Sequence, residues 1–422
     1  MRPLKIALLS RWYWEESRYH QEDEEGGPAQ QLAEAVAALG NEVIVLTQSP
    51  EVRKLRKYPI GSLETWASPR GRHRSLITSV RDRMAKRTYS YSQIYSDALA
   101  LREFLTLRGP FDVIWAHSES PDGLVAAMAA KLGFKLPPVL LQVQHLRYRF
   151  TKTGPKFVEK VPLHFAFRHA ARIIASSEMI AESLLAYAGP GLTADALKAK
   201  TRIIYPNLQR AFFRAAEETS YVTGPMPDRI LFVGTLEKPK GAQVFLEAVP
   251  KTEVAKRIST FAVIGDFTEY NRRNIRRWEQ AQEETRLKLP GARMEYLGRV
   301  SSYEVIRQMR LACAIVIPSL FDSFARSLLE ALALGRPVIT TDKVGASQLV
   351  RDYGCGIIVP PNDSDALARA IDVVLSPLVP FADKARHVGP RLLHEFSSEA
   401  IARQIAQNLI KISGRADEAL QA

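Results

Sequence analysis

Residues 315–346 read IVIPSLFDSFARSLLEALALGRPVITTDKVGA, which predicts a strand, a polar loop, a helix and a second strand. The apolar run 315–317 stops at Pro318, as is typical of a buried parallel strand whose carboxyl end opens onto a site. Ser327 is the expected N-cap of the helix, and Gly335 is its expected stop signal. The leucines between them form one broad apolar stripe, so we expect this helix to pack on a sheet.

The start of this predicted helix is suited to a phosphate, because backbone N–H groups and the positive end of the helix dipole gather there. Glu330 lies about one turn into the helix. Its carboxylate would repel a phosphate, so we expect it to accept hydrogen bonds from hydroxyl groups such as those of a ribose. The alternative is that Asp322 is an ordinary loop residue and Glu330 a solvated helix residue.

Length and composition indicate a globular protein of more than one domain. The chain has 422 residues, of which 46% are hydrophobic, and this length exceeds what one core usually serves. No apolar run approaches a membrane span, and residues 5–9 are read as a first strand and not as a signal peptide. We therefore expect a cytoplasmic protein. Cys313 and Cys355 lie in apolar contexts, so both are expected to be reduced core residues.

The net charge of +13 is concentrated in residues 51–87, which contain eleven Lys or Arg and three acidic residues. Such a patch fits nucleic acid, an anionic membrane surface or a solvated face. No nucleic-acid motif accompanies the charge, so we expect no nucleic acid partner. Peripheral attachment to the inner face of a membrane and a plain solvated face both remain open.

The rest of the chain alternates predicted strands and helices in two Rossmann-like halves. A polar segment rich in Thr, Gly and Pro separates these halves at 211–228. The predicted strands are residues 111–117, 139–143, 172–175, 202–205, 229–233, 261–264 and 294–297. The G-x-G-x-x-G fingerprint of dinucleotide oxidoreductases is absent from the sequence, which disfavours that class.

Asp322 and Glu330, eight positions apart and followed by ALALGRPVIT, resemble the E-x7-E block of the retaining glycosyltransferases of family four. GGPAQQLAEAVAALGNEVIVLT at 26–47 resembles the glycine-rich opening of that family. The segment 234–241 resembles its G-R-L-x-x-x-K-G motif, and 354–361 resembles its last strand.

The resemblance covers nearly the whole chain and implies an α/β protein of the GT-B fold, with two Rossmann-like doubly wound domains facing each other across a cleft. The implied parts are an acceptor domain at 1–210, a linker at 211–228, a nucleotide-sugar donor domain at 229–392, and a helix at 393–415 that crosses back to the first domain.

The resemblance also implies roles in the donor site. Asp322 would touch the donor sugar, Glu330 would bind the ribose, and Lys240 would neutralise the diphosphate. Thr235 stands where the family has Arg, and Arg326 is the expected substitute. The sequence also has Ser323-Phe324-Ala325 where Gly-Phe-Gly is usual. The full predicted donor-binding set is Gly27, Gly234, Thr235, Lys240, Gly265, Ser323, Phe324, Ala325, Arg326, Ser327, Leu328 and Glu330.

In the first domain the family places a histidine near the reacting carbon. Gln144 occupies that position and His145 follows it, whereas His117 ends the preceding strand. We therefore predict His145 or His117 as a catalytic residue beside Asp322, the alternative being a hydrogen-bonded structural histidine. Trp12, Tyr13 and Trp14 are predicted to stack on the acceptor, or alternatively to anchor their loop.

The implied activity is a hexosyltransferase-type transfer, with retention, from a nucleoside diphosphate sugar to a saccharide or lipid-linked saccharide in polysaccharide biosynthesis. No cofactor and no metal are expected, because Lys240 and the helix start would stabilise the diphosphate. The D-x-D sequence at 363–365 is read as a helix cap. A non-catalytic relative acting as a binding subunit is the alternative, favoured by Asp322, Ser323 and Thr235.

Overall fold

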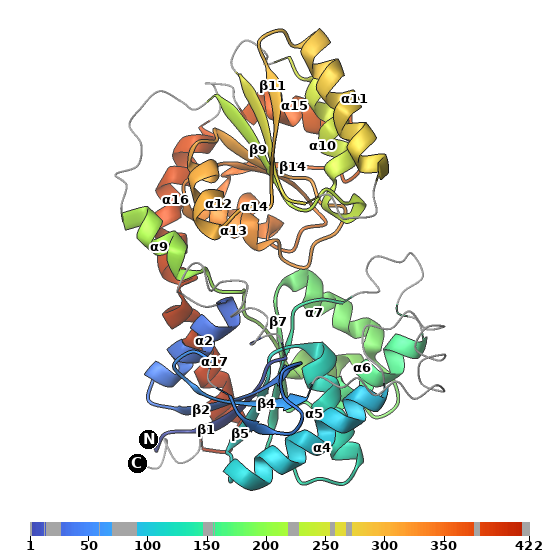
Figure 1. Ribbon diagram of the computed structural model, residues 1–422, viewed down its shortest axis with the longest axis vertical. Helices are drawn as coiled ribbons and strands as arrows, with labels where there is room; N and C mark the ends of the chain where they lie inside the picture. The colour runs from blue at the N-terminus through green and yellow to red at the C-terminus, as the bar shows by residue number, and fades with distance from the viewer. Residues whose placement is uncertain are drawn as a thin grey trace. The chain divides into compact units, whose positions relative to one another are not determined.

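The computed structural model describes residues 2–11, 13, 27–58, 60–69, 91–146, 155, 157–217, 228–253, 258–266, 272–374 and 380–415. The chain divides into two compact units, of which unit 1 comprises Met1–Asn207 and Ser398–Ala422, and unit 2 comprises Leu208–Ser397. Each unit has a mainly parallel sheet with helices on both faces (Figure 1). The prediction of two parallel-sheet α/β domains is confirmed.

The described residues of unit 1 form an eight-stranded sheet in the order β3-β4-β2-β1-β5-β6-β7-β8. Its strands are β1 (Lys5–Leu9), β2 (Glu42–Ser49), β3 (Arg56–Lys57), β4 (Glu64–Pro69), β5 (Val113–Ala116), β6 (Val139–Val143), β7 (Arg172–Ala175) and β8 (Thr201–Ile203). The helices are α2 (Pro28–Ala38), α4 (Tyr91–Arg108), α5 (Leu124–Lys131), α6 (Phe157–His169), α7 (Glu178–Leu184), α8 (Ala194–Lys200) and α17 (Ser398–Ile412). Strand β3 pairs antiparallel with β4.

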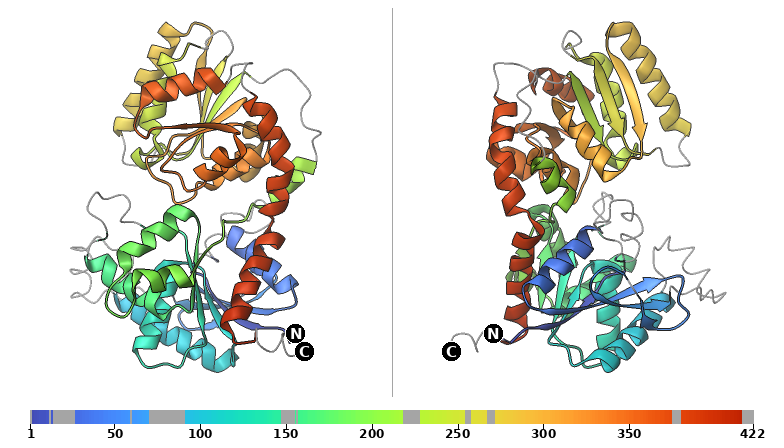
Figure 2. Two further views of the ribbon diagram at one scale, coloured as in Figure 1. Left: turned by 180° about the vertical axis from the view of Figure 1, so that it is seen from behind. Right: turned by 60° about the vertical axis from the view of Figure 1, so that its left-hand side comes forward.

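The strands of unit 1 are apolar throughout because helices cover both faces of its sheet. Phe104 of α4, Ala126 of α5 and Phe167 of α6 share one buried cluster with alternate strand residues such as Leu9 and Ile114. Helices α2 and α17 contact each other and lie on the other face (Figure 2). The helix that follows Ser397 therefore completes unit 1.

The described residues of unit 2 form a six-stranded parallel sheet in the order β11-β10-β9-β12-β13-β14. Its strands are β9 (Arg229–Val233), β10 (Thr260–Ile264), β11 (Arg293–Gly298), β12 (Ala314–Ile317), β13 (Val338–Thr341) and β14 (Gly356–Val359). The helices are α9 (Arg210–Glu217), α10 (Ala242–Ala248), α11 (Arg272–Lys288), α12 (Ser302–Arg310), α13 (Arg326–Ala333), α14 (Ser347–Tyr353), α15 (Ser364–Val374) and α16 (Phe381–Glu395).

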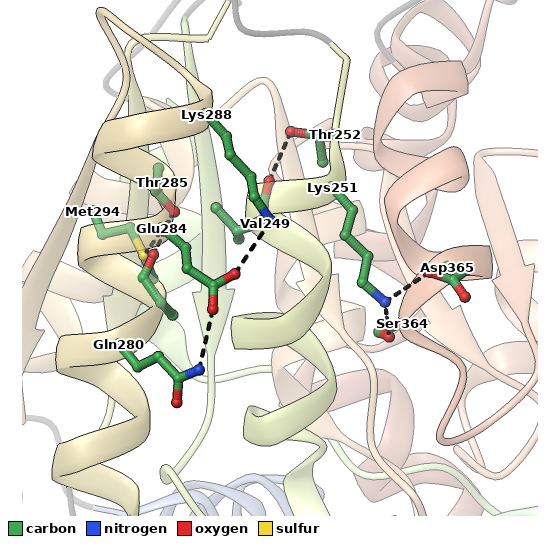
Figure 3. Close-up of polar contacts among 11 residues, drawn as sticks. Val249, Lys251, Thr252, Gln280, Glu284, Thr285, Lys288, Met294, Ser364 and Asp365 are labelled. Atoms are coloured by element: carbon green, nitrogen blue, oxygen red, sulfur yellow. Dashed lines mark hydrogen bonds and ion pairs between the residues drawn. The ribbon is translucent and has the colours of Figure 1, made fainter.

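Helices α10, α11 and α15 cover one face of this sheet and share its buried cluster. Polar contacts at the surface link the segment after α10 to α15 and join neighbouring turns of α11 (Figure 3). Lys251 Nζ donates to Asp365 Oδ1 at 2.7 Å and to Ser364 Oγ at 2.8 Å, at the start of α15. On α11, Glu284 accepts hydrogen bonds from Gln280 and Lys288.

Some element boundaries differ from those predicted. Residues 211–217, expected in the linker, belong to helix α9, because Phe212 and Ala215 are buried on one side of this short helix. The helix expected at 393–415 is α17 (Ser398–Ile412), and residues 393–395 belong to the preceding helix α16, which ends at Glu395. Both cysteines are free and buried, as predicted.

Candidate active site

The sheet order of unit 2 identifies where a ligand would bind. The chain runs from β9 outward to β10 and β11, and then returns to β12 on the other side of β9. In doubly wound sheets the crevice at the carboxyl ends of such neighbouring strands is the usual ligand site. The loops that follow β9 and β12 contain most of the predicted donor-binding residues.

These two loops touch through their backbones. The Leu320 amide donates to Pro239 O at 2.8 Å. Gly241 has φ +72°, and a Cβ atom there would lie 1.9 Å from Pro318 O. A side chain at 241 would therefore separate the loops, so glycine is required for the close approach.

The predicted Gly265 supports the same edge of the sheet. A Cβ atom on this residue, which follows β10, would lie 2.0 Å from Gly234 O. The Gly234 amide in turn donates to Ile264 O at 2.9 Å. Gly234 and Gly265 thus hold the turns after β9 and β10 together, and Thr235 lies half-buried in the first turn.

Lys240 and Asp322 meet where the two loops join. Lys240 Nζ lies 2.5 Å from Asp322 Oδ2, with 39% and 11% of the respective side chains exposed. Asp322 Oδ1 accepts hydrogen bonds from the amides of Phe324 at 3.2 Å and Ala325 at 2.9 Å. The first predicted donor carboxylate is therefore engaged with protein groups through both oxygens.

The expected N-cap at Ser327 is wrong. Helix α13 begins at Arg326, and Ala325 is its N-cap residue, with φ 60° and ψ 78° in the left-handed region. The Asp322 carboxylate caps the loop instead and accepts from the Ala325 amide. No acceptor for the amides of Arg326 and Ser327 is found among the described residues, and these amides open the helix.

The other predicted residues of this segment are packed inside unit 2. The side chains of Ser323, Phe324 and Leu328 are buried. The Leu328 amide is already used, since it donates to Ala325 O at 2.9 Å.

Arg326 and Glu330 lie four residues apart on α13, so they occupy the same face. Arg326 Nε is buried without a hydrogen-bond partner among the described residues. Burial raises the pKa of the Glu330 carboxyl to about 7, although the Arg326 guanidinium acts in the opposite direction. A buried donor without a partner beside a carboxyl with a raised pKa is typical of a binding site.

In unit 1, the corresponding switch point, where the order of the strands changes direction, lies between β1 and β5. His117 directly follows β5 and is 7% exposed, and its amide donates to Leu9 O at 2.9 Å. Gln144 Nε2 lies 3.3 Å from His117 Nε2 and donates to His117 O at 3.2 Å. His145 is exposed on the following loop, whereas His117 and Gln144 contact each other through their side chains.

Buried carboxyl groups beside this pair were missed by the sequence reasoning. Burial raises the pKa values of Glu119 and Asp122 to about 7 and of Asp97 to about 6. Glu119 Oε2 accepts from the Gln144 amide at 3.1 Å, which anchors the loop of His145. The S-E-S-P-D sequence at 118–122, which follows His117, was the available signal for Glu119 and Asp122.

Of the three aromatic residues predicted to contact the acceptor, the structure describes only Tyr13. Tyr13 is fully buried, so stacking of its ring on a sugar is contradicted, because a large aromatic side chain is used here for packing. Trp12 and Trp14 lie outside the described residues. Gly27 precedes α2 as its N-cap residue, and its carbonyl accepts from the Gln31 amide at 3.0 Å.

The D-x-D sequence caps a helix, as predicted. Asp363 Oδ1 accepts from the Ala366 amide at 2.8 Å, and Asp365 pairs with Lys251. Among the described residues, no group of three or more His, Cys, Asp or Glu side chains has the arrangement of a metal site.

Only part of the basic segment 51–87 is described. Lys57 lies 3.8 Å from Glu64, and Arg56 lies over the Tyr58 ring. The cationic residues from 70 to 87 fall outside the described residues. Within the described part of the chain, no helix combines the length and apolar character needed to cross a bilayer.

A surface hollow of about 330 Å³ lies between α10 and α11. Polar side chains such as Gln243, Arg277 and Glu284 line it, with Leu246 and Ala281. None of the predicted site residues lines this hollow, so it is separate from the crevice at β9 and β12.

Two family models match the chain. The model described as Glycosyl transferases group 1 matches residues 227–376, within unit 2. The model described as Glycosyl transferase 4-like domain matches residues 28–197, within unit 1. The glycogen synthase of Mycobacterium tuberculosis is 25% identical over 391 residues, covering 89% of this chain and 88% of that protein. The alpha-D-kanosaminyltransferase of Streptomyces kanamyceticus is 22% identical over 290 residues, covering 64% of this chain and 69% of that protein.

Solved structures share the fold. Anabaena HepE in complex with UDP and glucose has a TM-score of 0.63 at 16% identity, covering 96% of this chain and 99% of that chain. The alpha,alpha-trehalose-phosphate synthase of Burkholderia vietnamiensis has a TM-score of 0.70 at 13% identity, covering 97% and 100%. The fold is GT-B, as predicted.

Proposed function

The chain belongs to the group 1 glycosyltransferases, and from that premise we propose that it transfers a sugar, with retention, from a nucleoside diphosphate donor to an acceptor hydroxyl group. One observation carries the donor class. The loops after β9 and β12 join at the switch point of unit 2, and they bring Lys240 to the edge where α13 begins. The HepE complexes, which contain UDP or UDP-glucose, support the same donor class.

The donor site divides into a phosphate end and a ribose end. The amides of Arg326 and Ser327, the Arg326 guanidinium and the Lys240 ammonium supply positive charge for the leaving diphosphate. Glu330, one turn further along α13, accepts hydrogen bonds from the ribose hydroxyl groups. Arg326 is thereby the cation that replaces the arginine expected at Thr235.

The acceptor is a saccharide or a lipid-linked saccharide bound by unit 1, where His117 is the candidate beside the reacting carbon. His117 is supported over His145 because it lies at the switch point between β1 and β5 and is held by Gln144.

A thermal-shift screen of UDP, GDP, ADP and their sugars tests the donor class. A ligand at 100 times its Kd should stabilise the fold by about 2.7 kcal/mol. Incubation of the best nucleotide sugar with the protein should then release the nucleoside diphosphate, and NMR of the product would report the anomeric configuration. Binding without any release, with or without acceptor, would instead favour the non-catalytic relative.

The charge of segment 51–87 supports a lipid-linked acceptor at an anionic membrane surface. Each Lys or Arg near such a surface contributes about 1 kcal/mol, and salt weakens the attraction. The protein should sediment with anionic vesicles and not with neutral ones, less so in high salt and when Arg81, Arg83, Lys86 and Arg87 are changed to Glu. Equal binding to both vesicle types, or none to anionic vesicles, would point to a soluble acceptor.

A further inference from the structure

The Asp322 side chain is bound through both oxygens by groups of its own unit. Its Oδ1 accepts two backbone N–H groups, from Phe324 and Ala325, and its Oδ2 lies 2.5 Å from Lys240 Nζ. A carboxylate offers about four lone-pair directions, and three are taken by these partners. Only 11% of the side chain is exposed, so little of it faces a ligand.

The backbone of Asp322 is fixed as well. Its amide donates to Lys343 O at 2.9 Å, and its carbonyl accepts from the Gly345 amide at 2.9 Å. It also forms an isolated parallel bridge with Val344, in the loop after β13. Asp322 is therefore held between the loops that follow β9, β12 and β13.

We propose that Asp322 is a positioning residue, which fixes Lys240 and the turn at Ala325, and that it is not a ligand of the donor sugar. This inference rests on the proposed donor site. Asp is one methylene shorter than the Glu usual at this position, and the shorter side chain suits bonds to amides two and three residues ahead. A longer side chain would move the carboxylate away from these amides.

The turn at Ala325 explains why such a contact is needed. Ala325 has φ 60°, in the left-handed region that residues other than glycine rarely adopt. The hydrogen bond from its amide to Asp322 holds that conformation, and α13 begins at the next residue. Asp322 thus orients the Arg326 and Ser327 amides without touching the ligand.

The two roles predict different binding data. A nucleoside diphosphate and its nucleotide sugar share the phosphates that Lys240 and α13 would bind, and only the second carries a sugar. Loss of a positioning residue weakens both ligands by the same factor, whereas loss of a sugar ligand weakens only the nucleotide sugar.

Calorimetric titration of both ligands should be run on the wild type, Asp322→Ala, Asp322→Asn and the control Asp342→Asn, whose carboxylate pairs with Lys343 at the surface. For Asp322→Ala we expect a loss of about tenfold for each ligand, as for one charged hydrogen-bond partner. Asp322→Asn keeps an oxygen for the two amides and should lose less. A loss confined to the nucleotide sugar, or no loss for either ligand, would overturn the inference.

A double-mutant cycle separates positioning from general damage. If Asp322 acts through Lys240, Asp322→Ala should cost less affinity in a Lys240→Ala background than in the wild type. Equal losses in the two backgrounds would show that Asp322 does not act through Lys240.

Hydrogen exchange tests the turn without any nucleotide. Amides of the segment 322–328 should exchange faster in Asp322→Ala than in the wild type and Asp342→Asn. Unchanged exchange would refute the positioning role, whatever the ligand. If the wild type bound no nucleotide, the proposed function would be refuted. The exchange result would still decide whether Asp322 holds the turn.

Discussion

Glu330→Gln tests the ribose end of the donor site, because it removes a titrating carboxyl group and keeps the length of the side chain. Burial raises the pKa of Glu330 to about 7 from an ordinary value of 4.5, against the influence of Arg326. The carboxyl therefore changes its charge near neutral pH in the folded protein. Ligand affinity should follow that change if the ribose hydroxyl groups bind the ionised form.

The size of the effect follows from the pKa. With a pKa of about 7, roughly one carboxyl in ten is ionised at about pH 6 and roughly nine in ten at about pH 8. Wild-type affinity should therefore rise about tenfold over this interval, which corresponds to about 1.4 kcal/mol. Glu330→Gln should bind about tenfold more weakly than the wild type at about pH 8, and its affinity should not change with pH.

The assay is calorimetric titration with a nucleotide sugar. Both of its phosphates are esterified, so their charge stays constant over this range, whereas a terminal phosphate titrates near pH 6. Glu284→Gln is a matched control, since Glu284 lies on the surface of α11 (Figure 3). Melting temperatures of the variants would show that both are folded.

Two results would refute the reasoning. Wild-type affinity that is independent of pH, with equal affinity for Glu330→Gln, would remove Glu330 from the ribose site. Affinity that falls as the pH rises would show that the carboxylate repels the diphosphate, and would place Glu330 at the phosphate end.

Two further predictions concern Arg326 and Glu119. Arg326→Ala should weaken nucleoside diphosphate binding by roughly tenfold to a hundredfold, the cost of one charged hydrogen-bond partner. Adding Thr235→Arg to the Arg326→Ala variant should restore part of this affinity. Full affinity in the single variant would make Arg326 a surface residue. Burial raises the folded-state pKa of Glu119 to about 7, so its favourable contribution is present below about pH 4.5 and is lost as the pH rises through about 7. Denaturant titrations should show a flatter decline in unfolding free energy for Glu119→Gln over that window, and an identical decline would refute the buried titration.

The strands were largely predictable from the sequence, because a parallel strand covered on both faces is a continuous apolar run. The predicted strands 139–143, 172–175 and 229–233 have the observed bounds of β6, β7 and β9. Strand β4 was not predicted, because its alternating residues 64–69 lie in the charged segment and show no apolar run. Its pairing with β2 is a tertiary effect.

The start of α13 shows where local preference fails. Ser327 has the side chain favoured at an N-cap, yet the helix begins one residue earlier. The Asp322 carboxylate, the Val344 bridge and the Ala325 turn together set that start. Residue preferences within the helix carry no information about those contacts.

The sequence shows that acidic residues follow strand β5 of unit 1, but their burial and their partners were not predictable, for a related reason. Asp122 Oδ1 accepts from the Arg11 amide, 111 residues away, and Glu119 accepts from the Gln144 amide, 25 residues away. These partners meet only because β5 lies between β1 and β6. The sheet order, and not the local sequence, therefore determines which carboxyl groups are buried beside His117.

The two departures from the family pattern in the loop after β12 are physically coupled. An alanine at φ 60°, where the family has glycine, costs about 1 kcal/mol or more. The bond from the Ala325 amide to the Asp322 carboxylate contributes a charged hydrogen bond of about 1.5–3 kcal/mol, which is enough to offset that strain. A Glu at 322 would place its carboxylate one methylene further away and lose this contact. Asp322 and Ala325 therefore form a consistent pair, and the unusual aspartate is what permits the unusual alanine at the start of α13.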